Sequence, residues 1–163
     1  MVSLYVAKYA RVGILLDTNL LILFLVGLFD STFIPIFKRT AMYTEEDFKK
    51  IEKFIKNFRN IFVTPQILAE LWNLLEKIEG ESFQRFLESA IPQLLIITEN
   101  YIHKNCILNE ESIKYIGLTD MSIILTAKEL NCLVLTDDFR AHSHFEKNGI
   151  AAININHLRL MQS

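Results

Sequence analysis

Five acidic residues of this sequence could act together, although they are widely separated along the chain. They are Asp17, Glu70, Asp120, Asp137 and Asp138. Carboxylates gathered within a few ångströms repel one another, and some of them take up protons unless a cation neutralises the group. Oxygen ligands without neighbouring thiols or imidazoles suit a hard ion such as Mg²⁺ or Mn²⁺. Such an ion can activate a water molecule and stabilise charge on a phosphodiester during hydrolysis.

Strand-like and helical patterns alternate along the chain and predict the elements that would position these acids. Short apolar, β-prone runs occupy 12–16, 61–63, 94–98, 133–136 and 150–155. Helical patterns occupy 20–28, a stretch opened by Thr44, a stretch opened by Thr64 and Pro65, 81–90, and a stretch capped by Thr119 that runs through Leu130 and closes at Asn131. Strands separated by helices favour right-handed β-α-β units, which build a parallel sheet covered on both faces. The predicted fold class is α/β, in one domain spanning 1–163.

This predicted sheet would bring the acids to one edge. Asp17 directly follows one strand-like run, and Asp137 and Asp138 directly follow another. Glu70 and Asp120 lie in the first two turns of helices. Because the carboxyl ends of parallel strands share an edge, and the helices that follow strands begin there, all of these acids are expected in one pocket.

The amino-acid composition limits the classes of protein to which the chain can belong. The chain has 163 residues, of which 51% are hydrophobic and 22% charged, as in an ordinary globular domain. Its net charge of −2 does not favour a general nucleic-acid binder, so a polyanion would need a local basic patch or a bound metal ion. Two cysteines, Cys106 and Cys132, are too few for a disulfide framework. We expect both to be small buried hydrophobic residues of a cytoplasmic protein.

The apolar segment 14–29 requires a test for a membrane span. It is shorter than the roughly 20 residues needed to cross a bilayer, and it carries Asp17, Thr18 and Asn19 near its start. We interpret it as a buried strand followed by a buried helix, with no membrane association.

Four motifs, in order along the chain, carry a family resemblance. They are Asp17-Thr18-Asn19, Thr64-Pro65-Gln66-Ile67-Leu68-Ala69-Glu70, Gly117-Leu118-Thr119-Asp120 before an apolar helix, and Leu135-Thr136-Asp137-Asp138. Together they resemble the motifs of the PIN-domain family, in particular its VapC-like metal-dependent ribonucleases. The resemblance covers nearly the whole chain.

The resemblance implies a three-layer α/β/α sandwich with a five-stranded, mainly parallel sheet and Mg²⁺- or Mn²⁺-dependent cleavage of RNA. The implied catalytic and metal-binding acids are Asp17, Glu70, Asp120 and Asp138, with Asp137 as a second choice for the fourth position. Thr18, Asn19 and Thr136 would orient the acids or the water by hydrogen bonds. Many family members are dimeric toxins of toxin–antitoxin pairs, which implies a homodimer and an antitoxin protein as a partner.

The chain departs from the compact toxins of that family in one place. The stretch between Asp17 and Glu70 is longer than usual, and the extra length, around 31–60, could form a lid, a partner surface or a dimer contact. Basic residues in it could guide RNA by contacting phosphates. They are Lys49, Lys50, Lys53, Lys56 and Arg59. A solvated helix face with lysines suited to the helix dipole explains them at least as well.

Other interpretations stay open. Taken singly, each acid is better explained as a turn or helix-end residue, and only their joint placement favours a site. One alternative is a non-catalytic PIN-like module that binds RNA or protein; another is a hydrolase of small phosphate esters, although no glycine-rich phosphate loop is present. We expect His142 and His144 at the surface and Trp72 in the core.

Overall fold

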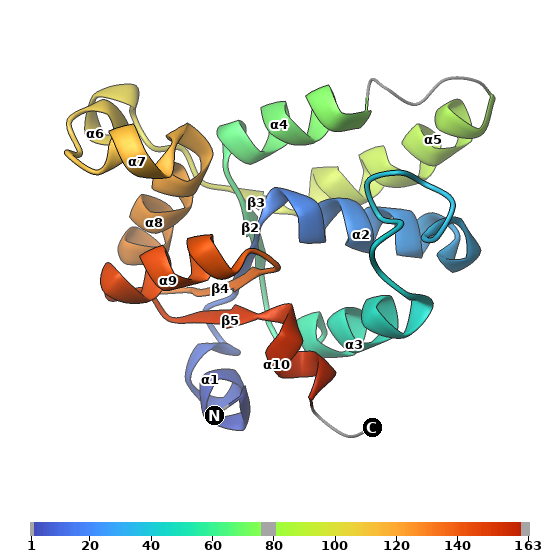
Figure 1. Cartoon of the computed structure of the whole chain (residues 1–163), viewed down its shortest axis with the longest axis horizontal. Helices are drawn as coiled ribbons and strands as arrows, with labels where there is room; N and C mark the ends of the chain where they lie inside the picture. The colour runs from blue at the N-terminus through green and yellow to red at the C-terminus, as the bar shows by residue number, and fades with distance from the viewer. Residues whose placement is uncertain (1, 76–80, 161–163) are drawn as a thin grey trace.

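The computed structural model describes residues 2–75 and 81–160, and within them a five-stranded, all-parallel sheet has the order β3-β2-β1-β4-β5 (Figure 1). The strands are β1 (Ile14–Leu16), β2 (Ile61–Val63), β3 (Thr98–Glu99), β4 (Leu133–Thr136) and β5 (Ala152–Asn154). Every residue of β1 and β4 is buried, as expected for central strands covered on both faces. The predicted α/β fold class is confirmed.

Helices connect and cover these strands. They are α1 (Val2–Tyr9), α2 (Thr18–Phe29), α3 (Glu45–Ile55), α4 (Pro65–Leu75), α5 (Glu81–Ile96), α6 (Lys104–Leu108), α7 (Ile113–Ile116), α8 (Leu118–Leu130), α9 (Phe139–Lys147) and α10 (Ile155–Arg159), with a 3-10 turn, η1, at Ser31–Phe33. The α2 helix packs against α3, α4 and α5, while α9 packs against β4 and β5. The strands β2 and β3 lie on one side of β1, and β4 and β5 lie on the other side. Right-handed crossovers therefore place α9 on the face opposite to α2 and the helices packed against it, which gives three layers.

Short-range chemistry explains where several helices begin and end. Thr44 starts α3 with a reciprocal capping box, in which its hydroxyl accepts from the Asp47 amide and Asp47 accepts from the Thr44 amide. Thr64 accepts a hydrogen bond from the Ile67 amide at 3.2 Å at the start of α4, which has Pro65 in its first turn. Asn131 ends α8 in the left-handed conformation, with φ of 50°. These three expectations are confirmed.

Some predicted boundaries are wrong. The apolar run 94–98 predicts a strand, but its first three residues form the last turn of α5, and the strand is only Thr98–Glu99. A short apolar run fits a strand or a helical turn equally well, and here the helix continues past Pro92. Thr119 does not cap α8, because that helix begins one residue earlier, at Leu118, after Gly117.

The apolar segment 14–29 forms β1 and α2, as predicted. In α2 the residues Leu20 to Gly27 are all buried, because α3, α4 and α5 surround the helix. None of the helices in the described ranges is both long and apolar enough to span a membrane.

Three single-residue expectations are wrong. Cys106 is exposed on α6, although Cys132 is buried as predicted. His142 is buried on α9, where Nε2 lies 3.3 Å from the carbonyl oxygen of Ala152, because that side of α9 packs on β5. Trp72 remains 42% exposed on α4, since the apolar face of that helix is formed by Ile67, Leu71 and Leu75.

Candidate acidic site

The carboxyl ends of β1 and β4 lie next to each other at the point where the order of the strands reverses direction. The chain passes from β1 to β2 on one side and returns to β4 on the other, which is where open α/β sheets bind ligands. Asp17 follows β1, and Asp137 and Asp138 follow β4. The amide of Asp17 donates to the carbonyl oxygen of Leu135 at 3.0 Å, so the two strand ends are joined beside the acids.

Asp17 lies at the centre of this edge and is only 8% exposed. It begins α2, and its Oδ1 accepts a hydrogen bond from the Leu20 amide at 2.9 Å. Its Oδ2 accepts from the Asp137 amide at 3.0 Å. One carboxylate therefore connects the start of α2 to the end of β4, and its orientation is determined by backbone groups from both elements.

Asp137 and Asp138 are held in different ways. Asp137 accepts hydrogen bonds from the hydroxyl of Tyr43 and from Nδ2 of Asn19, the latter at 3.3 Å. Asp138 begins α9, where its Oδ1 accepts from the amides of Arg140 and Ala141 at 2.6 and 3.1 Å. Both aspartates therefore lie at the edge, where side chains hold Asp137 and the first amides of α9 hold Asp138.

Besides Asn19, two other predicted supporting residues contact the acids. The buried hydroxyl of Thr18 donates to Oε2 of Glu70 at 2.8 Å, which holds the glutamate of α4 beside the start of α2. The buried hydroxyl of Thr136 accepts from the amide of Asp138 at 3.1 Å. Side chains from α2 and β4 therefore position acids that belong to other elements.

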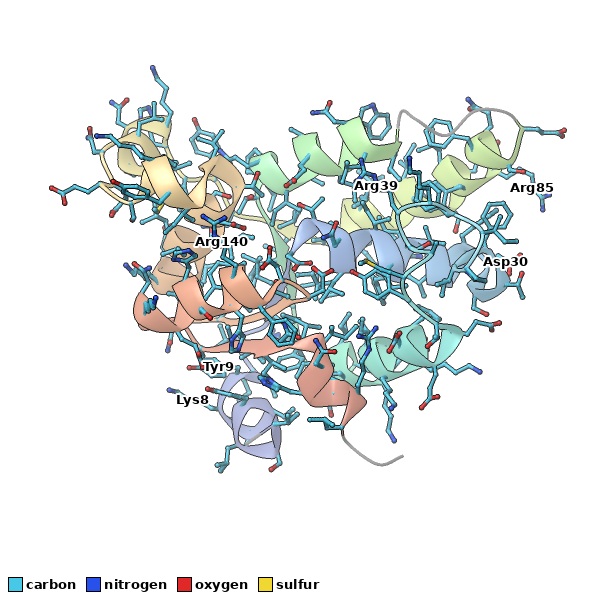
Figure 2. All side chains as sticks on the ribbon, viewed as in Figure 1. Lys8, Tyr9, Asp30, Arg39, Arg85 and Arg140 are labelled. Carbon is cyan, nitrogen blue, oxygen red and sulfur yellow. The ribbon has the colours of Figure 1, made fainter. Side chains whose placement is uncertain are left out.

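Asp120 brings the α8 helix to the same edge. Burial, followed by the negative charges of Asp138 and Glu70, raises its pKa to about 6, while Arg140 has the opposite effect. Arg140 is exposed on α9, and its Nη2 lies 3.4 Å from the carbonyl oxygen of Tyr115 in α7. Figure 2 shows this arginine between α7 and α9. The acids of α4, α8 and α9 therefore share one electrostatic environment.

Asp17 is subject to the same repulsion. Burial, followed by the negative charge of Asp137, raises its pKa to about 8, whereas hydrogen bonds from Thr136, Leu20 and Asp137 lower it. This carboxyl group is therefore hard to ionise chiefly because it is buried, and the negative charge of Asp137 adds to the effect.

Oxygen donors with uncompensated charge fit a hard divalent cation, Mg²⁺ or Mn²⁺. The residues that would hold one are Asp17, Glu70, Asp120 and Asp138, with Asp137 adjacent. In the described part of the chain, no three acidic, histidine or cysteine side chains are already arranged as an ion-binding group.

The predicted RNA-contacting cations lie on or just after α3. Lys49, Lys53, Lys56 and Arg59 are exposed, and Lys50 is partly buried. Lys50 forms an ion pair with Glu46 at 3.1 Å, and Lys56 forms one with Glu52 at 2.7 Å. The helix begins near Tyr43, at the acidic edge, and the chain then enters β2 at its amino end. The later cations of this set therefore approach the opposite edge, and their role in RNA binding stays a prediction.

Sequence reasoning did not identify Tyr43, Arg140 or Arg159 as residues of this region. Arg140 could have been found from its position two residues after Asp138, at the start of a helix. Tyr43 and Arg159 had no such signal, because Tyr43 contacts Asp137, and Arg159 contacts Asp47 near Tyr43, from segments that are distant in sequence.

The sequence matches no family model and no curated protein with which it was compared. The fold and the site by themselves define the class: a three-layer α/β/α protein with a cluster of carboxylates at the carboxyl edge of its parallel sheet, where the strand order changes direction.

Proposed function

We propose that the chain is a PIN-type, metal-dependent endoribonuclease that hydrolyses RNA phosphodiester bonds. The observation that carries the proposal is the meeting of acids from α4, α8 and the ends of β1 and β4 at one edge. Burial is the first cause of the raised pKa values of Asp17 and Asp120, and the negative charges of their acidic neighbours, which raise both values further, favour a cation there.

The residues of the chain have distinct parts in this proposal. Asp17, Glu70, Asp120 and Asp138 hold Mg²⁺ or Mn²⁺, with Asp137 beside them. When bound, the ion supplies Lewis-acid stabilisation of phosphoryl charge and lowers the pKa of a water molecule. Thr18 orients Glu70, and Asn19 orients Asp137. Arg140, exposed beside Asp120, is placed to contact a substrate phosphate.

The resemblance extends the proposal to the cellular setting. It favours a cytoplasmic homodimer that acts as the toxin of a toxin–antitoxin pair, with 31–60 contributing a partner or dimer surface. Sedimentation of the purified protein would test the dimer, and a monomer at all concentrations would remove that part of the proposal without affecting the nuclease.

Cleavage of labelled RNA tests the proposed activity. Purified protein is mixed with single-stranded and structured RNAs in Mg²⁺, Mn²⁺ or EDTA, beside Asp17→Asn. We expect cleavage that needs the metal and falls by at least about 100-fold in the variant, because a metal-bound carboxylate is lost. Asp30→Asn is the matched control, since Asp30 also caps a helical turn but lies at the far end of α2. Metal-dependent cleavage retained by Asp17→Asn would contradict the site.

A non-catalytic binding module is the second candidate, and one observation favours it. Both oxygens of Asp17 and both oxygens of Asp137 already accept hydrogen bonds from the protein itself. Such an arrangement can persist without a metal ion. RNA binding without cleavage in Mn²⁺, by folded protein, would favour this second candidate.

A further inference from the structure

The acidic site receives a side chain from the long segment between β1 and β2. Tyr43 lies just before α3, is only 4% exposed, and donates its hydroxyl hydrogen bond to Oδ2 of Asp137. The other oxygen of Asp137 accepts from Asn19. Two donors, from α2 and from the segment before α3, therefore determine the orientation of one carboxylate beside Asp17.

The segment that carries Tyr43 is itself packed into the protein. Ile34 and Thr40 are fully buried, and the Thr40 hydroxyl donates to the carbonyl oxygen of Ile34 at 2.8 Å. The amide of Tyr43 donates to the carbonyl oxygen of Thr40 at 2.9 Å. The backbone that presents the Tyr43 hydroxyl is thus part of an ordered turn.

An ion pair between the buried Asp47 and the exposed Arg159 connects the start of α3 to the last described helix. Arg159 of α10 donates from Nε to Oδ1 of Asp47 at 2.7 Å and from Nη2 to Oδ2 at 2.8 Å. Asp47 is 6% exposed and also completes the capping box of Thr44, the residue after Tyr43. Two-point pairing of this kind specifies geometry as well as contributing energy.

Electrostatics agree with a tight pair. Burial alone would raise the pKa of Asp47, but the hydrogen bond from Arg159, with those from Thr44, keeps the pKa of this carboxyl below its ordinary value.

The α10 helix is fixed in turn by β5. Asn154, the last residue of β5, accepts from the Asn156 amide at 3.0 Å and forms a capping box with His157. Nη1 of Arg159 donates to Oδ1 of Asn156 at 2.9 Å. A continuous series of polar contacts therefore runs from β5 through α10 and α3 to the acidic site.

We propose that Tyr43 is a positioning residue of the acidic site and that the Asp47–Arg159 ion pair anchors Tyr43 there. The inference rests on the proposed function, because it assigns Tyr43 to the orientation of Asp137, which lies beside the four proposed metal-binding acids and is the second choice for the fourth of them. It gives the segment 31–60 a role in the site itself. Loss of a hydrogen-bond partner that orients a metal ligand typically lowers metal affinity or activity by about 10- to 100-fold.

Tyr43→Phe is the deciding variant, since it removes the hydroxyl and keeps the packed ring. Binding of Mn²⁺ alone is measured by calorimetry, and cleavage of RNA is measured in the same buffer. We expect Mn²⁺ affinity and kcat to fall about tenfold, with KM for RNA and the melting temperature close to those of the unmodified protein. Tyr101→Phe is the matched control, because Tyr101 is exposed and follows β3, the edge strand that β2 separates from β1.

The anchor is tested by Arg159→Met and by its combination with Tyr43→Phe. If Arg159 acts through Tyr43, Mn²⁺ affinity falls in the single variant, and the double variant is no weaker than Tyr43→Phe. Glu52→Gln, which breaks the Glu52–Lys56 ion pair on the same helix, should leave Mn²⁺ affinity unchanged. Losses that multiply in the double variant would overturn the anchoring role.

The outcomes separate this inference from the proposed function. Unchanged Mn²⁺ affinity and kcat in Tyr43→Phe would overturn the positioning role while leaving a ribonuclease intact. Weaker Mn²⁺ binding in Tyr43→Phe, from a protein that cleaves no RNA, would support the positioning role and reject the ribonuclease. Absence of Mn²⁺ binding by the unmodified protein would overturn both.

Discussion

At the scale of single residues, the acids of the site differ in what holds them. Both oxygens of Asp17 accept hydrogen bonds from backbone amides, and Glu70 accepts a hydrogen bond from the hydroxyl of Thr18. Asp120 lies in the first turn of α8, where the charges of Asp138 and Glu70 oppose its ionisation. A substitution at Asp120 therefore tests the total charge of the acids, whereas a substitution at Thr18 tests the orientation of Glu70.

Asp120→Asn should stabilise the metal-free protein at neutral and alkaline pH. Burial, then Asp138 and Glu70, raise the pKa of Asp120 from 3.8 to about 6 in the folded state. The folded protein therefore binds this proton more tightly than the unfolded chain does, so stability is greatest below about pH 4 and is lost as the pH rises through about 6. The variant should be more stable by about 1–2 kcal/mol at pH 8, allowing for solvent screening, and the gap should close near pH 4.

Urea unfolding in EDTA across this pH range measures the effect, with Glu129→Gln on the same helix as the control. A destabilised Asp120→Asn variant at pH 8 would mean that the carboxylate is compensated by groups other than a metal ion.

Thr18→Val should weaken the site without disturbing the fold. Valine has nearly the shape of threonine but cannot donate to Glu70, so the glutamate loses its orientation. We expect Mn²⁺ affinity or kcat to fall about tenfold, measured by calorimetry and RNA cleavage. Thr18→Ser keeps the hydroxyl and should retain most activity; a loss in Thr18→Ser with none in Thr18→Val would show that packing, and not the hydrogen bond, is responsible.

At the scale of elements, the close packing of α2 against α3 determines where Tyr43 and its anchor lie. Gly27 of α2 faces the ring of Phe48 in α3, and a Cβ atom at position 27 would lie 2.2 Å from that ring. The absence of a side chain at Gly27 allows the two helices to approach this closely. The α3 helix in turn packs against α10, so the α2–α3 distance also affects the Asp47–Arg159 pair.

Gly27→Ala should destabilise the protein even though alanine favours helices. The intrinsic gain is about 1 kcal/mol, whereas forcing extra volume into a packed contact costs about 1–3 kcal/mol. We expect the free energy of unfolding in urea to fall by about 1–2 kcal/mol. One of the conflicting atoms is Cγ of Phe48, which cannot move without the rest of the side chain. Adding Phe48→Leu should recover part of the loss; a Gly27→Ala variant more stable than the unmodified chain would contradict this account of the interface.

At the scale of the whole molecule, the net charge is only −2, yet acids from four separate segments meet at one edge of the sheet. The fold places like charges together and leaves them incompletely compensated. Any cation that binds there stabilises the folded state, since the unfolded chain does not hold the acids together.

Mn²⁺ should therefore raise the melting temperature. At about 100 times its dissociation constant, the ion adds about 2.7 kcal/mol, which corresponds to roughly 5–10 °C for a chain of this size. The increase should be smaller at pH 5 than at pH 8, because Asp17 and Asp120, whose pKa values are raised to about 8 and about 6, chiefly by burial, retain protons at the lower pH. Thermal scans with Mn²⁺ or EDTA measure this, and a pH-independent increase would place the ion elsewhere.

Local patterns in the sequence were sufficient to predict the α/β class, most strand positions and the acids that follow the strands. Apolar periodicity, the capping box of Thr44 and the turn at Asn131 depend on residues only a few positions apart. The carboxyl edge then follows from the parallel arrangement, so the meeting of Asp17 with Asp137 could be expected from their positions after two strand-like runs.

The residue that reaches the site from a distant segment, and the residue that anchors that segment, could be identified only from the packing of the elements. The contact of Tyr43 with Asp137 and that of Arg159 with Asp47 join positions with no local relation, and no sequence pattern encodes them. The same holds where a local pattern is ambiguous: 94–96 is helical because the helix from Glu81 continues through it, and His142 is buried because α9 packs on β5. Local chemistry specifies elements, whereas packing between elements specifies which side chains meet.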